Sequence, residues 1–292
     1  MTVTAEQVKK LRDQTGAGMM ECKAALTEAN GDFEEANVIL RKRGLASAAK
    51  KAGRATSEGL IGHSLSADHA QGILVEVNCE SDFVARTDDF KQLIKDVLAE
   101  IDKVGTNATD TWLKDPEGPV RKRVAATIGK LGENMAVPRF ARYSGQGYVG
   151  QYLHQGGKIG VQVEFGGVTA DISAREEFAN LVKDVAMQIA AASPEVARYL
   201  SRDNVPADVL DKERAIYRAQ MENSGKPAQV IDKIVEGKLG SFFQQVVLLD
   251  QPFIRAELKM AVKDVLAAAN KALGSSVTIT RFARLKVGDA GA

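Results

Sequence analysis

The chain contains few residues of the types that perform catalysis or bind metals. Its histidines and cysteines are scattered over 292 residues, at His63, His69, His154, Cys22 and Cys79. Zinc sites need closely paired ligands such as CxxC or HxxxH, and the sequence contains neither pair. It also lacks phosphate-binding GxxxxGK[ST] loops and nucleophilic GxSxG turns. We therefore expect no metal, no cofactor and no catalytic site, and we predict that the chain is not an enzyme.

One glycine-rich motif needs an explanation, because Gly145, Gly147 and Gly150 match the dinucleotide-binding pattern GxGxxG. Asp171 follows at about the spacing of an acid that binds a ribose hydroxyl. The pattern has this function only where a helix begins at the glycines and offers its N-terminus to a pyrophosphate. Residues 151–157 are instead typical of a strand that ends in a turn. The sequence therefore predicts a strand here and no dinucleotide site.

An acid next to an aromatic residue is the most distinctive candidate contact. Asp82 and Phe83 lie in a loop between an expected strand and an expected helix, where functional residues concentrate. Asp82 could simply cap the helix, and Phe83 could pack in a local core. Alternatively, the two side chains could form an exposed wedge that enters a partner protein. The residue types alone leave both interpretations open.

Two other positions are candidate contacts with equally simple alternatives. Met19 and Met20 begin an expected helix, and two adjacent methionines cannot both face one core from that position. They are either a core residue with an exposed neighbour or a flexible apolar contact for a partner, a role that suits methionine. His154 lies near Gly156 and Gly157, so it is either an ordinary turn residue or another contact.

The N-terminal residues 1–45 are predicted to form a module of three short helices. Thr4 and Gln7 match a capping box before the first helix. Gly44 is expected to end the third helix. A basic stretch at 46–58 follows, which we interpret as a solvated linker rather than an RNA-binding tract because the chain as a whole is not basic.

An internal repeat organises the remaining chain. Residues 59–101 align without a gap on 147–189, and residues 120–142 align on 262–284. In the second pair, the sequence Arg-Phe-Ala-Arg at 139–142 recurs at 281–284. Each copy is predicted to be a β-β-α-α-β unit, and the second copy carries an insertion between its two parts.

These patterns predict an α+β fold with five parts. The insertion contains two apolar helical patterns that start near Pro206 and Pro227, which predicts a helical hairpin. This hairpin could contact a partner, form a homodimer or pack against the core. The expected parts are the N-terminal module (1–45), the linker (46–58), core subdomain N (59–144), core subdomain C (145–200 and 250–287) and the hairpin (201–249).

Composition limits the classes of function. The 39 basic and 38 acidic residues give a net charge of +1, whereas nucleic-acid binders usually have a basic excess. No apolar run approaches the roughly 20 residues that span a bilayer, and no signal peptide is visible at the N-terminus. We therefore expect a cytoplasmic protein that binds neither nucleic acid stably nor a membrane, and whose partner is another protein.

Several of these segments resemble the bacterial elongation factor Ts family, and the resemblance covers nearly the whole chain. Its most specific part is the segment Asn-Cys-Glu-Ser-Asp-Phe-Val-Ala at 78–85, in which Ser81 stands where the family commonly has threonine. The segments that carry the resemblance are 15–26, 50–53, 75–85, 154–161, 224–227 and 251–253.

The resemblance implies a fold and a function. The fold would be a UBA-like N-terminal module followed by the duplicated core, and the function would be guanine nucleotide exchange on elongation factor Tu. The residues implied to dock on the partner's GTPase domain are Arg12, Met19 and Met20. The residues implied to disturb its magnesium and phosphate site are Ser81, Asp82, Phe83 and Val84. A further partner contact is implied for His154.

Overall fold

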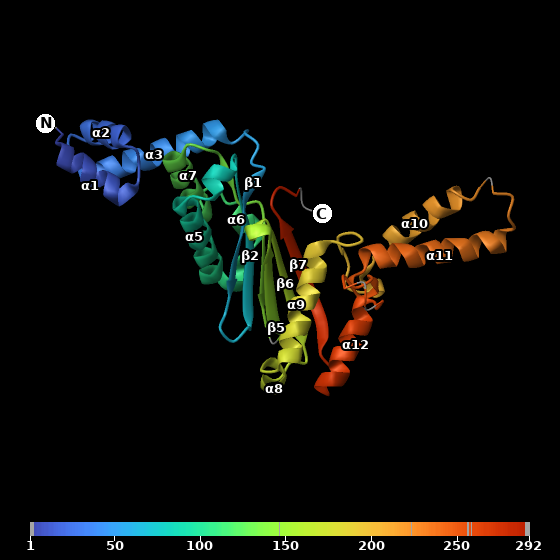
Figure 1. The fold of residues 1–292 in the computed structure, drawn as a ribbon. Coiled ribbons are helices and arrows are strands. Elements are labelled where there is room, and N and C mark those ends of the chain that lie inside the picture. The colour runs from blue at the N-terminus through green and yellow to red at the C-terminus, as the bar shows by residue number, and fades with distance from the viewer. Residues whose placement is uncertain (1–2, 146, 223, 256, 258, 290–292) are drawn as a thin grey trace.

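The computed structural model describes residues 3–289 except 146, 223, 256 and 258. It has the mixed helix and sheet content of an α+β protein, with two antiparallel sheets. The sheets pack face to face, and helices cover the outer face of each sheet (Figure 1). The N-terminal helices lie at one end of this four-layer core, and a helical hairpin projects away from it. No helix among the described residues is long and apolar enough to span a membrane.

The N-terminal module contains the three expected helices. They are α1 (Ala5–Thr15), α2 (Met19–Glu28) and α3 (Phe33–Lys51). The capping box is confirmed, because Thr4 Oγ1 accepts from the Gln7 backbone N–H and Gln7 Oε1 accepts from that of Thr4. The small core of the module includes Leu11, Cys22 and Leu26. Such a core buries little apolar surface, so most of the stability of the chain must lie elsewhere.

The prediction that Gly44 ends the third helix is wrong. Helix α3 continues to Lys51, so the expected boundary at residue 45 falls inside it. The alanine-rich residues beyond Gly44 are good helix formers. Gly44 itself lies where α3 crosses α7 (Pro119–Leu131), and a Cβ there would lie 3.4 Å from the carbonyl oxygen of Ala125. This glycine allows two helices to pack closely.

The first sheet and its helices form one half of the core. The strands are β1 (Glu58–Leu65), β2 (Gln71–Cys79), β3 (Met135–Ala136) and β4 (Phe140–Ser144). The helical segments are α4 (Asp82–Ala85), α5 (Asp88–Val104), η1 (Gly105–Asn107), α6 (Asp110–Leu113) and α7. Strand β2 is central and pairs antiparallel with the other three. Helix α5 buries one apolar stripe, including Phe90, Val97 and Ile101, against this sheet.

The second half has its elements in the same chain order. Its strands are β5 (Tyr148–His154), β6 (Ile159–Gly166) and β7 (Thr278–Lys286). Its other elements are η2 (Gln155–Gly157), α8 (Ala170–Ser173), α9 (Glu176–Ala191) and α12 (Val262–Leu273). The strand predicted after the glycine-rich motif is confirmed, because β5 pairs with β6 along its whole length. No helix N-terminus is available at Gly147 for a dinucleotide.

The inner faces of the two sheets meet through small and apolar residues. A Cβ at Gly160 would lie 2.5 Å from the Ile61 side chain, and one at Gly72 would lie 2.7 Å from that of Val149. Gln151 crosses the interface, because its Nε2 donates to the carbonyl oxygens of Ser64 and Ile73. The two halves therefore form one continuous body.

The inserted hairpin has the expected helices. Its elements are η3 (Arg202–Asn204), α10 (Ala207–Ala219), α11 (Ala228–Val246) and η4 (Leu248–Asp250). Pro206 and Pro227 occupy the N-cap positions of α10 and α11. The base of the hairpin is fixed by the buried Asp250 carboxylate, which accepts from Arg202 at 2.7 Å and from Lys263 at 2.9 Å.

Candidate partner-binding site

The Asp-Phe segment forms a short helical turn, α4, immediately after the central strand of the first sheet. Ser81 is the N-cap of this turn, and its Oγ accepts from the backbone N–H of Val84 at 3.4 Å. Asp82 and Phe83 are the first two residues of the helix. The interpretation of Asp82 as the capping residue is therefore wrong, because the serine hydroxyl performs that function.

Both distinctive side chains of α4 lie on the surface. Phe83 is 79% exposed, so it is not a core aromatic. The Asp82 carboxylate accepts from Arg86 at 2.6 Å, one helical turn further on. Sequence reasoning did not identify Arg86, although its spacing of four residues from Asp82 is typical of an ion pair on a helix. An exposed aromatic ring thus lies beside a carboxylate whose direction is set by an arginine.

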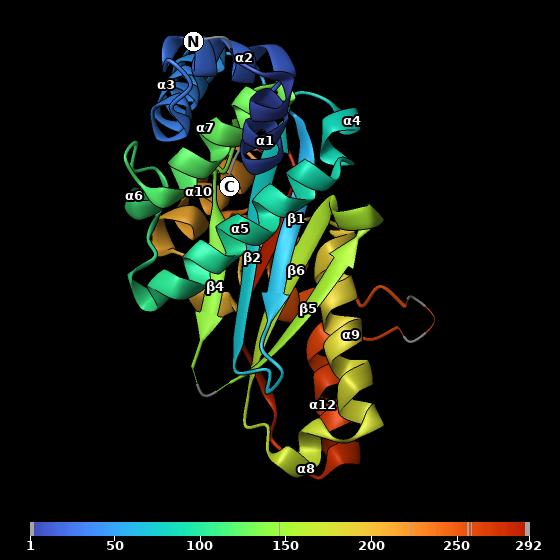
Figure 2. The ribbon, with the colours of Figure 1, turned by 90° about the vertical axis from the view of Figure 1, so that its left-hand side faces the viewer.

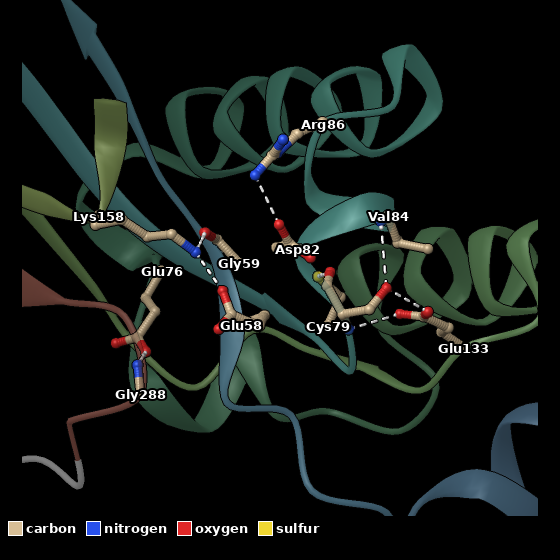
Figure 3. A network of polar contacts seen from close by, with 11 residues as sticks. Glu58, Gly59, Glu76, Cys79, Asp82, Val84, Arg86, Glu133, Lys158 and Gly288 are labelled. Carbon is tan, nitrogen blue, oxygen red and sulfur yellow. Dashed lines mark hydrogen bonds and ion pairs between the residues drawn. The ribbon is translucent and has the colours of Figure 1, made fainter. Parts of the chain in front are cut away.

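A network of hydrogen bonds holds the α4 turn from below (Figure 3). The Glu133 carboxylate accepts from the Ser81 backbone N–H at 2.9 Å and from its hydroxyl at 2.6 Å. The Cys79 thiol donates to the Ser81 carbonyl oxygen at 3.1 Å. Next to this serine, the Glu80 carboxylate accepts from the Asn134 backbone N–H at 2.6 Å. Nothing in the sequence pattern identifies Glu133, because it lies on a separate loop after α7.

Burial makes the Cys79 thiol chemically inert. Burial, together with the neighbouring negative charge of Glu133, raises the pKa of Cys79 to about 12. The thiolate is the reactive form of cysteine. Cys79 therefore acts at neutral pH as a buried hydrogen-bond donor, not as a nucleophile.

The η2 turn that follows His154 is attached to the first sheet near α4. Lys158 follows η2, and its ammonium group donates to the Glu58 carboxylate and to the Gly59 carbonyl oxygen. Glu58 pairs in register with Cys79 at the end of β2 (Figure 3). His154 itself is half-buried, and its Nδ1 lies 3.1 Å from the Tyr152 hydroxyl. The end of β5 thus lies at the same end of the sheets as α4 (Figure 2).

The candidate residues of the N-terminal module belong to α1 and α2, and these helices lie at this end of the molecule (Figure 2). Met19 is 44% exposed and Met20 is 76% exposed. Neither methionine belongs to the buried core of the module, so the interpretation as a core residue with an exposed neighbour is wrong. Arg12 on α1 is also exposed.

The described part of the chain offers no set of side chains for a metal. Among these residues, no group of three or more histidine, cysteine, aspartate or glutamate side chains is arranged to hold an ion. The surface around α4 instead presents an aromatic ring and charged groups on a fixed turn. Such a surface suits recognition of another protein, because aromatic and arginine side chains are enriched at protein–protein interfaces.

Comparison with known proteins identifies the family. Residues 80–289 match the family model described as "Elongation factor TS". Elongation factor Ts of Aquifex aeolicus is 44% identical, with 99% of both chains covered. That of Nitratiruptor sp. is 45% identical, and that of Trichlorobacter lovleyi 42%; each match covers 99% of this chain and 94% of the relative. A family match over most of the chain, with relatives of this identity over nearly its full length, shows that the chain belongs to the elongation factor Ts family of translation factors.

Proposed function

We propose that this protein is a guanine nucleotide exchange factor that binds elongation factor Tu in its GDP-bound form and accelerates GDP release. Family membership supports this function, and one observation in the structure carries the mechanism. Phe83 is 79% exposed on a turn that Ser81 and Glu133 hold in place. An apolar ring in water on a preorganised turn loses little conformational entropy when it enters a partner.

The chemistry of the partner explains how such a wedge would act. A GTPase holds GDP through backbone amides and a magnesium ion with strict octahedral geometry. Insertion of Phe83, with Asp82 beside it, would displace these groups and weaken nucleotide binding. The coupling is reciprocal, so GDP weakens binding of the exchange factor by the same factor. No acid or base of the factor itself is required, and its action is not that of an enzyme.

The size of the coupling requires more than one contact. A shift of about 10⁴ in nucleotide affinity corresponds to roughly 5.5 kcal/mol, which is more than one aromatic residue typically contributes to an interface. We propose that Arg12, Met19 and Met20 dock on the GTPase domain and that His154 adds a further contact. Ser81 and Val84 complete the wedge as the cap and the third residue of α4.

The same proposal includes the origin of the fold and the compartment in which the protein acts. The two halves would have arisen by duplication of a β-β-α-α-β unit, and the N-terminal helices would form a UBA-like module. The protein would act in the cytoplasm, without a cofactor.

The hairpin has exposed apolar residues at Ile216 and Val230, and either the partner or a second copy would cover them. Sedimentation of the free protein and of the complex would distinguish these two occupants.

Release of a fluorescent GDP analogue from bacterial elongation factor Tu tests the function. The wild-type protein is expected to accelerate release strongly, and Asp82→Ala and Phe83→Ala are expected to reduce that acceleration. Asp171→Ala, at the position equivalent to Phe83 in α8, serves as a matched control and should behave as wild type. No acceleration by the wild type, with an active partner, would contradict the proposed function.

A further inference from the structure

Helix α7 connects the two surfaces that would contact the partner. Along its length it packs on α3, where Gly44 and Gly129 approach so closely that a Cβ at Gly129 would lie 3.4 Å from the Gly44 Cα. The Lys130 side chain lies against Gly16, in the connection that precedes Met19. The position of the N-terminal module is therefore set by the surface of α7.

The C-terminal end of the same helix holds the α4 turn. Gly132 ends α7 in the left-handed conformation, with φ of 80°, and the chain turns into Glu133 and Asn134. Glu133 binds the backbone N–H and the hydroxyl of Ser81. The Asn134 side-chain amide donates to the carbonyl oxygen of Arg54, shortly after α3 ends, at 2.8 Å. Two consecutive residues thus contact both the wedge and the segment that leaves the N-terminal module.

The second half of the core provides an internal comparison. Thr169 caps α8 as Ser81 caps α4, with its Oγ1 3.3 Å from the backbone nitrogen of Ile172. The residue aligned with Glu133 is Ser275, which hydrogen-bonds to Asn270 instead. The α8 turn is tied to α12 by Arg175, which donates to backbone carbonyl oxygens there. In the described residues, a carboxylate holds the capping residue only in the half that carries the exposed aromatic.

We propose that Glu133 is a positioning residue for nucleotide exchange: its carboxylate fixes the Ser81 turn that directs Asp82 and Phe83, and it joins this turn to the helix on which the N-terminal module packs. This inference rests on the proposed exchange function. Hydrogen bonds to an ionised carboxylate are shorter and stronger than neutral ones. Two of them to one serine hold its backbone at φ of −125° and ψ of 155°, from which α4 starts.

The test separates an effect on the position of the α4 turn from an effect on binding of elongation factor Tu. Release of the fluorescent GDP analogue is measured at increasing concentrations of full-length wild type, Glu133→Ala, Glu133→Gln and the control Glu117→Gln. The control removes an exposed carboxylate just before α7. We expect Glu133→Ala to lower the maximal release rate about tenfold, because the charge-assisted hydrogen bonds to Ser81 are lost. The half-saturating concentration should stay near that of wild type, because the N-terminal contacts remain.

Two further readouts distinguish positioning from a general loss of structure. Glu133→Gln should recover part of the rate, because its amide oxygen can accept from the Ser81 N–H and its amide N–H₂ can donate to the hydroxyl. Amide hydrogen exchange should accelerate at residues 82–85 in Glu133→Ala and stay unchanged at residues 170–173.

Three outcomes would overturn the inference. A wild-type maximal rate in Glu133→Ala would do so and leave the exchange function standing. Equal loss of rate in both Glu133 variants, with faster hydrogen exchange in α8 as well as α4, would show a merely structural role. A wild-type protein that fails to release the analogue would remove the exchange function and this inference together.

Discussion

The turns α4 and α8 occupy equivalent places in the two halves of the core, yet they present different surfaces. Each follows the central strand of its sheet and is capped by a short hydroxyl residue, Ser81 or Thr169. Helix α4 then exposes Asp82 and Phe83, whereas α8 begins with Ala170 and Asp171. Both halves have the capping hydroxyl, so the fold itself requires it. The acid and the aromatic are not required by the fold, so they are the residues to which a function can be assigned.

The ion pairs of two buried glutamates show the opposite pattern, because both halves of the core contain one. Glu76 accepts from Arg139 Nε at 2.7 Å in the first sheet, and Glu164 accepts from Arg281 Nε at 2.8 Å in the second. In the second half the pair joins the central strand β6 to β7, and in the first half it joins β2 to the residue directly before β4. Features repeated in both halves therefore stabilise the fold, and features found in one half are candidates for function.

The largest expected effect tests the shared ion pairs. Glu76→Gln should lower the free energy of unfolding by about 3 kcal/mol, because it leaves a largely buried arginine without its carboxylate. Glu164→Gln should cost less, because the Arg281 side chain is 46% exposed and can turn to water, whereas that of Arg139 is 23% exposed. Urea unfolding of both variants measures this difference. A larger loss in Glu164→Gln would contradict it.

The next effect concerns the residue that differs between the turns. Phe83→Ala should reduce GDP release from elongation factor Tu about 30-fold, the equivalent of a 2 kcal/mol hot spot. The melting temperature should stay unchanged, because the ring is already exposed in the free protein. Asp171→Ala should change neither quantity. A lowered melting temperature in Phe83→Ala would show that the ring stabilises the fold and would contradict its assignment to the partner.

A smaller effect compares the two caps. Ser81→Ala and Thr169→Ala should each cost about 1 kcal/mol of stability, since each removes the side chain that accepts from the first turn of its helix. Only Ser81→Ala should also slow GDP release, because its hydroxyl is bound to Glu133. Thermal unfolding and release assays on both variants provide the comparison. Slower release in Thr169→Ala, to the same extent, would remove the distinction between the turns.

The last comparison concerns Cys79, which is aligned with Gly167 in the second half. At pH 8 its thiol should react with iodoacetamide far more slowly in the folded protein than in urea, because it is buried with a pKa of about 12. The unfolded chain loses this proton near pH 9, while the folded protein retains it up to about pH 12. Stability should therefore fall as the pH rises through that window. Equal labelling in both states would contradict this burial.

Local sequence signals predicted most elements of the fold. The capping box at Thr4, the hairpin starts after Pro206 and Pro227, and the strand after Gly147 depend on neighbouring residues only. The role of Gly44 could not be predicted in this way, because the helix that it meets lies far along the chain. A glycine that ends a helix and one that permits helix packing look the same in sequence.

The candidate site was predictable to a different extent. The residues of α4 were identified as an acid next to an aromatic residue in a loop between a strand and a helix, but their exposure depends on tertiary structure. Glu133 was missed because it reaches Ser81 across 52 residues of chain. Its contact exists only once α7 has packed beside the sheet. Local residue types thus indicated which residues present the surface, and the structure was needed to identify what holds them.

The most direct test exchanges the two turns. GDP release from elongation factor Tu is measured with the double variant Asp82→Ala/Phe83→Asp, which gives α4 the first two residues of α8. The reciprocal double variant Ala170→Asp/Asp171→Phe serves as the comparison. We predict that the first variant loses the acceleration while keeping its melting temperature, and that the second retains wild-type activity. Full acceleration by the first variant would contradict the central claim that the exposed acid and aromatic of α4 open the nucleotide site.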